Sequence, residues 1–336
     1  MNVVFRGLER VFAACVFLAV EIGIVLTAPG YYWQSVQRAR SFGRIPFHAY
    51  PRSADEKFLW RKLFDHDPRF TLISDKLALR DWIAETGLEL RMPRLCWAGL
   101  SPRSIPEELW FGDYVVKANH DSGSAIALWD DPPARETAIA QLEAALERDY
   151  SRAFAEWGYK LIAPRVFVEE RVGQAGSPVG DIKFYTFGRR IERIVHIEDR
   201  PGGRFGQVFE PDGAGGFYRL ERAPAVCDGT LETPLDDVLG RAVEMARALG
   251  ERFDHMRVDF LEAGGTLYLS EMTVYNQTGY ITDGGAFPHM QVSRAWDIRR
   301  SFALRTRHGG PFTRLYLGVL KRALDRAGAS DGLPPA

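Results

Sequence analysis

Hydrophobic and polar positions recur with different periods along this chain, and the change of period separates predicted helices from predicted strands. The run SDKLALRDWIAETG has apolar residues at helical spacing between Ser74, its predicted N-cap, and Gly87, its predicted end. Large apolar side chains every three or four residues from 133 to 157 predict one long amphipathic helix. Downstream, short runs rich in β-branched and aromatic residues predict strands: PRVFVEE, DIKFYTF, RIERIVHI, MRVDFLE and TLYLSEM.

These elements predict an α+β protein, with a small strand-and-helix lobe followed by a larger, mostly antiparallel sheet with helices. The chain has 336 residues, 46% of them hydrophobic, which is enough to bury a core in two or three lobes. A net charge of -1 gives no electrostatic reason to expect a nucleic-acid partner. The three cysteines have no metal-ligand spacing and cannot all pair, which favours a reducing, cytoplasmic setting.

The apolar run VFAACVFLAVEIGIVLTAP raises the question of a membrane. It follows Arg6 and Arg10, and Glu21 lies near its middle, where an acid costs about 3 kcal/mol on insertion scales. Three interpretations remain open: a buried or membrane-surface helix, a membrane anchor, and a signal peptide. Near the other end, the run from Tyr316 has a basic amphipathic pattern, and the final GASDGLPPA is predicted to be disordered.

Two lysines lie within predicted strands, where a charge among apolar neighbours usually faces an anion. Lys117 ends the strand YVVK, and Lys183 lies inside DIKFYTF. The turn after Lys117 contains Gly123, which lets backbone N–H groups approach an anion closely. Phosphate fits this pattern, although neither a P-loop nor a dinucleotide-binding motif is present. The alternative is two lysines paired with surface acids beside an ordinary loop.

The segment MRVDFLEAGGTLYLSEM predicts a hairpin that carries two acids. A three-residue loop at 263–265 would place Arg257 opposite Glu271 and Asp259 opposite Leu269. The arginine and both acids then share one face, with the carboxylates as diagonal neighbours roughly 7 to 8 Å apart. Such a pair suits a nucleotide-bound Mg²⁺, which accepts one or two protein carboxylates. The alternative is a cross-strand ion pair between Arg257 and Glu271 with a solvated aspartate.

The strand PRVFVEE ends in Glu169 and Glu170. Adjacent acids after a strand could accept ribose hydroxyls while the last backbone groups of the strand bind an adenine edge. The alternative is that both acids are simply solvated.

The order of these segments resembles the ATP-grasp superfamily, and specifically its TupA-like branch, which is associated with teichuronopeptide biosynthesis. The resemblance extends from about Pro51 to about Gly285. It is carried by ADEKFLWRKLFDHDPRFTLISDKLALRDWI, YVVKANHDSGS, YKLIAPRVFVEERV, GDIKFYTFGRRI and MRVDFLEAGGTLYLSEMTVYNQTG. It implies the ATP-grasp fold, in which two α+β lobes clasp the nucleotide, here with an additional N-terminal helical segment.

The expected parts of the chain follow from this resemblance. They are an apolar N-terminal helix at 1–35, a helical region at 36–105, a small ATP-grasp lobe at 106–170, a large lobe with the metal site at 171–310, and a C-terminal helix with a disordered tail at 311–336.

The resemblance also implies the cofactors ATP and Mg²⁺ and a role for each candidate residue. Lys117 and Lys183 would contact ATP phosphates, and Arg257 would orient a phosphate or an acyl-phosphate. Asp259 and Glu271 would hold Mg²⁺.

The remaining implied site residues belong to two segments. Ser122, Gly123 and Ser124 would form a mobile loop over the phosphates together with His120, which could donate, act as a base or be structural. The hinge that takes adenine and ribose would consist of Val168, Glu169 and Glu170. The candidate catalytic residues are His120, Lys183 and Arg257, and in the preceding helix Asp75, Lys76 and Arg80 either face substrate or support the lobe.

The sequence departs from the family pattern at two positions, Asp121 and Thr273. Asp121 stands where the branch usually has glycine, which adds a negative charge near the phosphate loop. Thr273 stands where many ATP-grasp enzymes have asparagine, which leaves a second Mg²⁺ open, and Asn276 is a possible substitute.

The function implied is ATP-dependent ligation of a carboxylate to an amine through an acyl-phosphate, in cell-surface polysaccharide or teichuronopeptide-type biosynthesis. The partners would be a small or polysaccharide-linked carboxylate, an amine and, through the N-terminal helix, the inner surface of a membrane. The alternatives are a kinase-like or glycosyl-transferring enzyme that uses the same nucleotide cleft, and a nucleotide-binding scaffold with a degraded active site.

Overall fold

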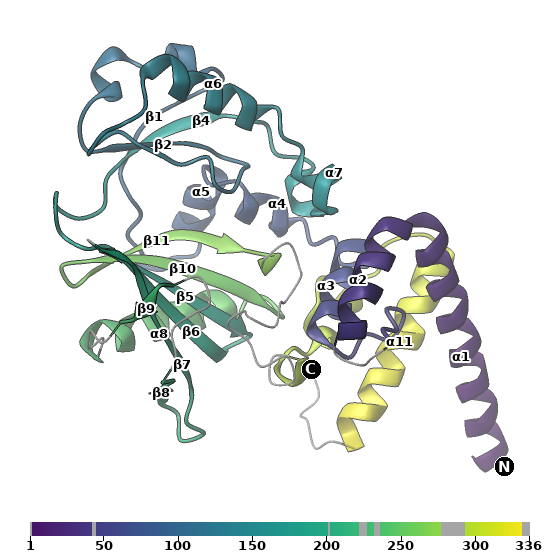
Figure 1. The fold of residues 1–336 in the computed structure, drawn as a ribbon. Helices are drawn as coiled ribbons and strands as arrows, with labels where there is room; N and C mark the ends of the chain where they lie inside the picture. Colours follow the sequence, from purple (N-terminus) through teal and green to yellow (C-terminus); the bar gives the residue numbers. More distant parts are fainter. Residues whose placement is uncertain are drawn as a thin grey trace. The chain divides into compact units, whose positions relative to one another are not determined.

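The computed structural model describes residues 2–41, 45–200, 202–221, 227–231, 236–276 and 293–330. The chain divides after Asp67 into two compact units (Figure 1). The helical unit contains the described residues up to 67 and from 293 to 330, and the two-sheet unit contains those from 68 to 276. The predicted disorder of the tail GASDGLPPA is wrong for its first three residues, 328–330, which belong to helix α11 (Pro311–Ser330). The other six, 331–336, lie outside the described part of the chain.

The helical unit is built from helices drawn from both ends of the chain. They are α1 (Asn2–Thr27), α2 (Pro29–Ser41), α3 (Ala54–Phe64), η5 (Ile298–Arg300), α10 (Phe302–Arg305) and α11 (Pro311–Ser330). The capping box of Ser53 and Glu56 starts α3 by satisfying backbone N–H groups that have no partner within the helix. Tyr316 of α11 joins the helices, because its hydroxyl accepts from Trp60 at 2.9 Å and its ring contacts Phe17 of α1 edge-on.

The acid in the middle of α1 is buried within this unit. Glu21 is 7% exposed and accepts hydrogen bonds from His48 Nδ1 at 3.0 Å and from the backbone N–H of Ala49 at 2.8 Å. The other ring nitrogen of His48 lies 2.7 Å from Ser35 Oγ of α2. A buried, fully bonded carboxylate agrees with the interpretation of α1 as a packed helix. By length and composition alone, residues 7–27 could still cross a membrane.

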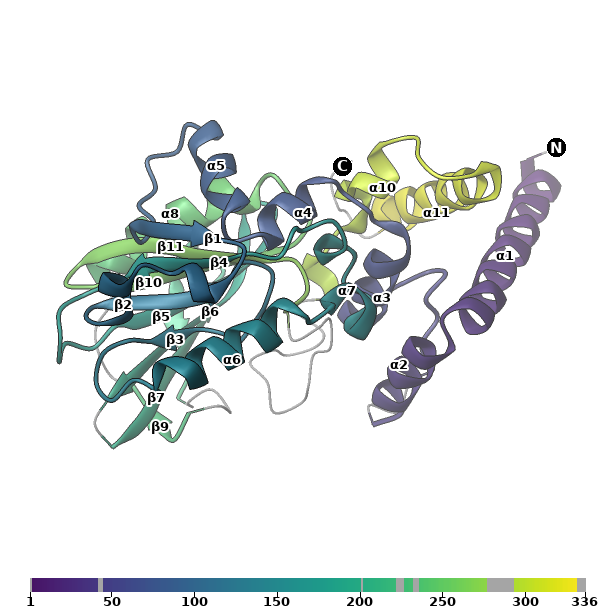
Figure 2. The same ribbon diagram turned by 90° about the horizontal axis from the view of Figure 1, so that it is seen from above.

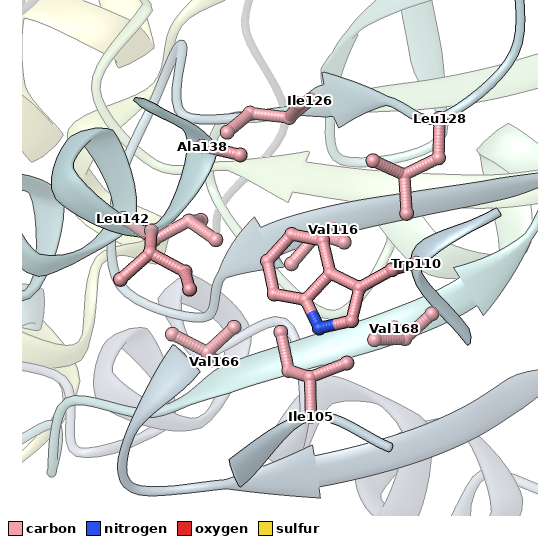
Figure 3. Close-up of a cluster of buried hydrophobic side chains, with 10 residues drawn as sticks. Ile105, Trp110, Val116, Ile126, Leu128, Ala138, Leu142, Val166 and Val168 are labelled. Carbon is pink, nitrogen blue, oxygen red and sulfur yellow. The ribbon is translucent and has the colours of Figure 1, made fainter. Parts of the chain in front are cut away.

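The smaller sheet of the two-sheet unit is antiparallel. It contains β1 (Leu95–Gly99), β4 (Val166–Glu170), β2 (Tyr114–Ala118) and β3 (Ile126–Ala127), in that spatial order. Figure 3 shows the core on one of its faces, where Val116, Val166 and Val168 meet Trp110 and Leu142. Because side chains alternate along a strand, the residues between these valines point to the other face.

The larger sheet has seven strands. They are β5 (Gly180–Phe187), β6 (Arg190–Arg200), β7 (Gly203–Pro211), β8 (Phe217–Arg219), β9 (Gly229–Thr230), β10 (Met256–Ala263) and β11 (Thr266–Thr273). Their order is β11-β10-β5-β6-β7-β8, and β9 pairs with β7. Helix α8 (Asp236–Gly250) packs along β10, β5 and β6 (Figures 1 and 2). The predicted α+β class is confirmed.

Two predicted helices differ from the structure. Ser74 ends α4 (Arg69–Ser74) instead of capping the next helix, and Asp75 Oδ1 accepts from the N–H of Leu77 at 2.9 Å at the start of α5 (Ala78–Glu85). Gly87 has φ +70, as expected just after a helix end.

The predicted long helix at 133–157 is wrong. It is divided into α6 (Arg135–Leu146), α7 (Tyr150–Phe154) and the 3-10 turn η3 (Trp157–Tyr159). Asp149 caps α7 by accepting from the N–H of Arg152 at 3.0 Å, and Ala155 ends that helix in a left-handed conformation. Two further 3-10 turns, η1 (Pro102–Ser104) and η2 (Glu107–Trp110), precede β2.

Candidate active site

A cavity of about 230 Å³ lies within the two-sheet unit. Its walls come from β2 and the loop after it, from strands β5, β10 and β11, and from the turn between α4 and α5. The charged residues that line it are Lys76, Lys117, Asp121, Asp181, Lys183, Asp259 and Glu271. Ser122, Gly123 and Ser124 of the loop after β2 also line it. Seven of the predicted site residues therefore line one cavity: Lys117, Ser122, Gly123, Ser124, Lys183, Asp259 and Glu271.

Strand alternation explains the position of Lys117. Its neighbours Val116 and Ala118 are fully buried, so the lysine projects from the opposite face of the sheet. There its Nζ forms an ion pair with Glu169 Oε1, and Arg80 Nη2 contacts the other carboxylate oxygen at 2.7 Å. Both carboxylate oxygens of Glu169, one of the two residues predicted as ribose acceptor, are thus bonded to cations of the protein itself.

The other predicted hinge residues do not line the cavity. The Val168 side chain belongs to the core of the smaller sheet, and its strand is hydrogen-bonded on both sides. Glu170 pairs with Arg94, and its backbone N–H donates to the carbonyl of Arg94 at 2.9 Å. The contact with adenine and ribose therefore stays a prediction.

The loop after β2 has the conformation that its glycine allows. Gly123 has φ +87, which favours glycine, and no heavy atom lies near the position of an added Cβ. Ser124 Oγ accepts from the N–H of Ala118 at 3.1 Å and so anchors the loop to the end of β2. This arrangement holds the loop beside the tip of the Lys117 strand.

His120 lies beneath this loop and does not line the cavity. Its side chain is buried, and burial lowers the pKa of the imidazole. Asn119 donates through Nδ2 to Asp75 and to the carbonyl of Ala163, so its Oδ1 is the acceptor that faces His120 Nδ1 at 3.3 Å. The structure therefore does not bring His120 together with the other candidate catalytic residues.

Asp121, the acid in the loop where the family usually has glycine, has a partner that the sequence did not suggest. The Asp121 carboxylate is buried and receives Arg148 Nη1 at 3.1 Å. Its carbonyl accepts from Lys76 Nζ at 2.5 Å, which positions that lysine at the cavity. Burial lowers the pKa of Lys76, and Glu271 opposes that shift. Arg148 neutralises the charge that distinguishes this loop from the family pattern.

The hairpin that carries the acids has a different register from the predicted one. Its turn has two residues, Gly264 and Gly265, at φ +57 and +79, so Ala263 pairs with Thr266. Continued without interruption, this register would pair position 259 with Ser270 and turn the two acids to opposite faces.

A β-bulge at this point restores the common face. Phe260 pairs with Leu269, but Asp259 pairs with Glu271, so Ser270 is the additional residue. Asp259 and Glu271 are therefore direct cross-strand neighbours and not diagonal ones. Arg257 pairs with Thr273 rather than with Glu271, although its side chain still reaches both acids.

Four charged side chains meet where β5, β10 and β11 lie side by side. Arg257 binds Asp259 through Nε at 2.7 Å and Nη2 at 2.5 Å, and Nη2 also donates to Glu271 at 2.9 Å. Lys183, opposite Asp259 in the sheet, lies 3.5 Å from its carboxylate and also pairs with Asp181.

Burial raises the pKa of Asp259 to about 6, against the opposing effect of Arg257 and Lys183. Burial also acts to raise the pKa of Glu271, but Lys76 and Arg257 outweigh it and lower the value to about 2. The Glu271 side chain is 35% exposed, and solvent screens part of that effect.

The acid pair fits Mg²⁺ in its usual nucleotide-bound form. Two carboxylates face each other across one ladder position, and Mg²⁺ takes one or two protein carboxylates together with phosphate oxygens and water. In the described ranges, no group of three or more His, Cys, Asp or Glu side chains could hold a metal alone. Asp259 and Glu271 are therefore the residues that would share Mg²⁺ with phosphate.

The side chains at the two positions considered for a second metal ion have different partners. Thr273 Oγ1 is 3.4 Å from Glu271 Oε1, beside the acid pair. Asn276 is buried and directs Nδ2 toward His255 Nε2 at 3.0 Å, and it does not line the cavity.

A lysine-lined cavity between two antiparallel α+β layers, with an acid pair on one strand ladder, defines an ATP-grasp protein. The chain matches the family model of TupA-like ATP-grasp proteins over residues 56–285 and belongs to that family. Proteins of the ATP-grasp family bind ATP.

Similar solved structures include a D-alanine–D-alanine ligase from Bacillus anthracis. It is 16% identical, and the alignment covers 77% of this chain and 69% of the ligase with a TM-score of 0.34. An L-amino acid ligase from Bacillus licheniformis is 18% identical over 74% of this chain and 49% of that one, with a TM-score of 0.36. A comparison with curated proteins found no match.

Proposed function

We propose that this protein is an ATP-dependent ligase that joins a carboxylate to an amine through an acyl-phosphate. The observation that supports this best is the cavity itself, in which three lysines face an acid pair bridged by an arginine. Phosphoryl transfer requires positioning and charge neutralisation more than a covalent intermediate with the enzyme, and this cavity supplies both.

The proposed reaction has two steps. A substrate carboxylate oxygen attacks the γ-phosphorus of ATP, the bond to the β–γ bridging oxygen breaks, and ADP leaves. The amine nitrogen then attacks the carbonyl carbon of the acyl-phosphate, the bond to the phosphate oxygen breaks, and the amine loses a proton. Lys117 and Lys183 neutralise phosphate charge, and Arg257 holds the group being transferred. Mg²⁺, bound by Asp259 and Glu271, would supply additional charge stabilisation.

The proposed substrates are a sugar-acid or amino-acid carboxylate and an amine that belong to a cell-surface polymer. The resemblance to teichuronopeptide-type proteins supports this choice. A panel of uronic acids and amino acids tested for ADP release, with and without amines, would identify the pair.

The test of the reaction uses substitutions in the cavity with matched controls. Lys117→Ala and Glu271→Gln should abolish ADP release, whereas the exposed Lys160→Ala and Glu85→Gln should leave it unchanged. Near-normal turnover in either cavity variant would refute the proposal.

The substrate requirement separates the alternatives. A ligase releases phosphate only when carboxylate and amine are both present. A stable phosphorylated product without an amine would identify a kinase instead. Mg²⁺-dependent ATP binding with no ADP formation from any substrate mixture would identify a scaffold.

We further propose that α1 lies on the cytoplasmic surface of a membrane. Between Val11 and Thr27 the only charged residue is Glu21, which is buried, so the outer surface of this stretch carries no charge. That surface is apolar and includes Leu18 at 57% and Leu26 at 74% exposure. An apolar surface of this length, which follows Arg10 on the same helix, suits the interface of a bilayer.

Cys15 provides a direct test because it is exposed on α1. In a variant with Cys96 and Cys227 changed to serine, a polarity-sensitive fluorophore on Cys15 should shift to the blue when vesicles are added. An unchanged spectrum with vesicles, or a shift that instead follows protein concentration and indicates self-association, would refute the membrane location.

A further inference from the structure

A second, larger cavity lies wholly within the helical unit, far along the chain from the cavity with the acid pair. It is a groove of about 670 Å³ formed by α10, the loop that follows it and α11. Its lining residues include Leu304, Arg305, Arg307, His308, Arg314, Leu315, Leu317 and Lys321. None of the residues considered for ATP or Mg²⁺ belongs to this groove.

Among the described residues, the charge lining the groove is entirely positive. Arg305, Arg307, Arg314 and Lys321 line it, and no acid in the described ranges does. All four are exposed, and none has an ion pair with a carboxylate in the part of the chain that the structure describes. Four unneutralised cations around one hollow repel one another, and a bound anion would relieve this repulsion. Guanidinium groups are particularly suited to phosphate, which they bind through parallel hydrogen bonds.

The floor of the groove is apolar. Leu304 and Leu317 line the groove and are buried, while Leu315 lines it and is 43% exposed. Phe312, about one helical turn before Leu315 and outside the lining, is 54% exposed. A free inorganic anion would gain nothing from these side chains. A ligand with a phosphate and an adjoining hydrocarbon part would use both the cations and the apolar floor.

The wall formed by the connecting loop is held in place. His308 Nε2 donates to the carbonyl of Phe64 at 3.1 Å, and its Nδ1 lies 3.3 Å from Thr306 Oγ1, whose hydroxyl donates to the carbonyl of Phe302 at 2.8 Å. The imidazole also lies against the ring of Phe302, with 5.5 Å between centroids. These contacts fix the end of α10, which carries Arg305, and the loop after it, which carries Arg307, so the groove is formed before any ligand enters.

We propose that this groove binds the phosphate headgroup of an anionic phospholipid. The inference extends the membrane location proposed for α1 and does not depend on the ligase reaction. The apolar surface of α1 would provide attachment to any bilayer, whereas the groove would make the helical unit prefer bilayers with negatively charged lipids.

The test uses two adjacent residues of α11 that differ in position but not in charge. Lys321 lines the groove, and Arg322 is exposed outside it. The full-length protein is sedimented, without ATP, with vesicles of phosphatidylcholine alone or mixed with phosphatidylglycerol. Lys321→Ala and Arg314→Ala should each weaken binding to the mixed vesicles about fivefold, and the double variant roughly 25-fold. Arg322→Ala should match the unmodified protein, and binding to phosphatidylcholine alone should not change.

Several results would overturn the proposal. An equal loss in Arg322→Ala would show a diffuse surface charge instead of a site, and so would equal binding to the two kinds of vesicle. Displacement from mixed vesicles by soluble glycerol phosphate at comparable phosphate concentration would show that the apolar part of the lipid is not used. Far-ultraviolet circular dichroism of each variant would exclude unfolding as the cause. Because the measurement needs no turnover, a failed ligase assay would leave it unaffected.

Discussion

Replacing Glu21 with leucine tests how α1 is held in the helical unit. The carboxylate accepts hydrogen bonds from His48 Nδ1 and from the N–H of Ala49, and all three groups are buried. Leucine has a similar length but no acceptor. The substitution would leave two buried donors unpaired at a cost of about 1 to 3 kcal/mol each. Burial of the additional apolar surface returns about 2 kcal/mol, which leaves a net loss near 2 kcal/mol.

The expected loss is local, so hydrogen exchange is the appropriate assay. Amide exchange in a peptide that covers residues 7–27 should become about 30-fold faster if opening of α1 becomes easier by about 2 kcal/mol. Glu9→Gln on the same helix is the control. Glu9 pairs with Arg326 at 3.0 Å, but both side chains are about half exposed, so exchange should change less than about fivefold.

The opposite result would contradict the packing of α1. If α1 instead crossed a bilayer, removing its central acid would favour insertion by about 3 kcal/mol. Slower exchange or unchanged exchange in the Glu21→Leu protein would therefore refute the buried carboxylate as the contact that holds this helix.

Three further predictions concern the two-sheet unit. Arg148→Ala removes the partner of the buried Asp121 carboxylate and should lower the unfolding free energy by about 1 to 2 kcal/mol, whereas Arg148→Lys should restore most of it in thermal denaturation. The lowered pKa of His120 means that, below the ordinary value of 6.5, the unfolded chain binds a proton that the folded protein does not. Stability should therefore fall as the pH drops below 6.5, and His120→Gln should fall less steeply; parallel curves would contradict this. Deleting Ser270 should remove the bulge and leave Glu271 opposite Asp259 in a regular ladder, so Mg²⁺-dependent nucleotide binding should persist in calorimetry, and its loss would argue against this pairing of the two acids.

The alternation of side chains along a strand was enough to predict which site residues share one face of a sheet. The alternation around Lys117 was visible in the sequence, and so was the common face of Arg257, Asp259 and Glu271. The register behind that common face was wrong. The two-residue turn and the bulge together pair Asp259 with Glu271 and not with Leu269, and this offset of two positions leaves the acids on the same face. Ser270 has no feature in the sequence that distinguishes a bulge from an ordinary strand position.

Contacts between distant segments could not be predicted from local patterns. Arg80 and Lys117 meet Glu169 across 89 and 52 positions, and only the sheet topology brings them together. The partnership of Asp121 with Arg148 has the same origin. One missed feature did have a signal: Asp149, a typical helix N-cap, stands within the apolar pattern that suggested a single helix.

The internal pairing of the cavity cations has a consequence for selectivity among anions. Lys117 already has a carboxylate partner in Glu169, and Lys183 has partners in Asp181 and Asp259. An entering anion must exchange with these carboxylates, not merely fill a vacant positive site. Chloride or a single phosphate gains too little charge interaction to drive that exchange, whereas a polyphosphate chain can replace several partners at once. Without nucleotide, this cavity should therefore bind abundant small anions only weakly.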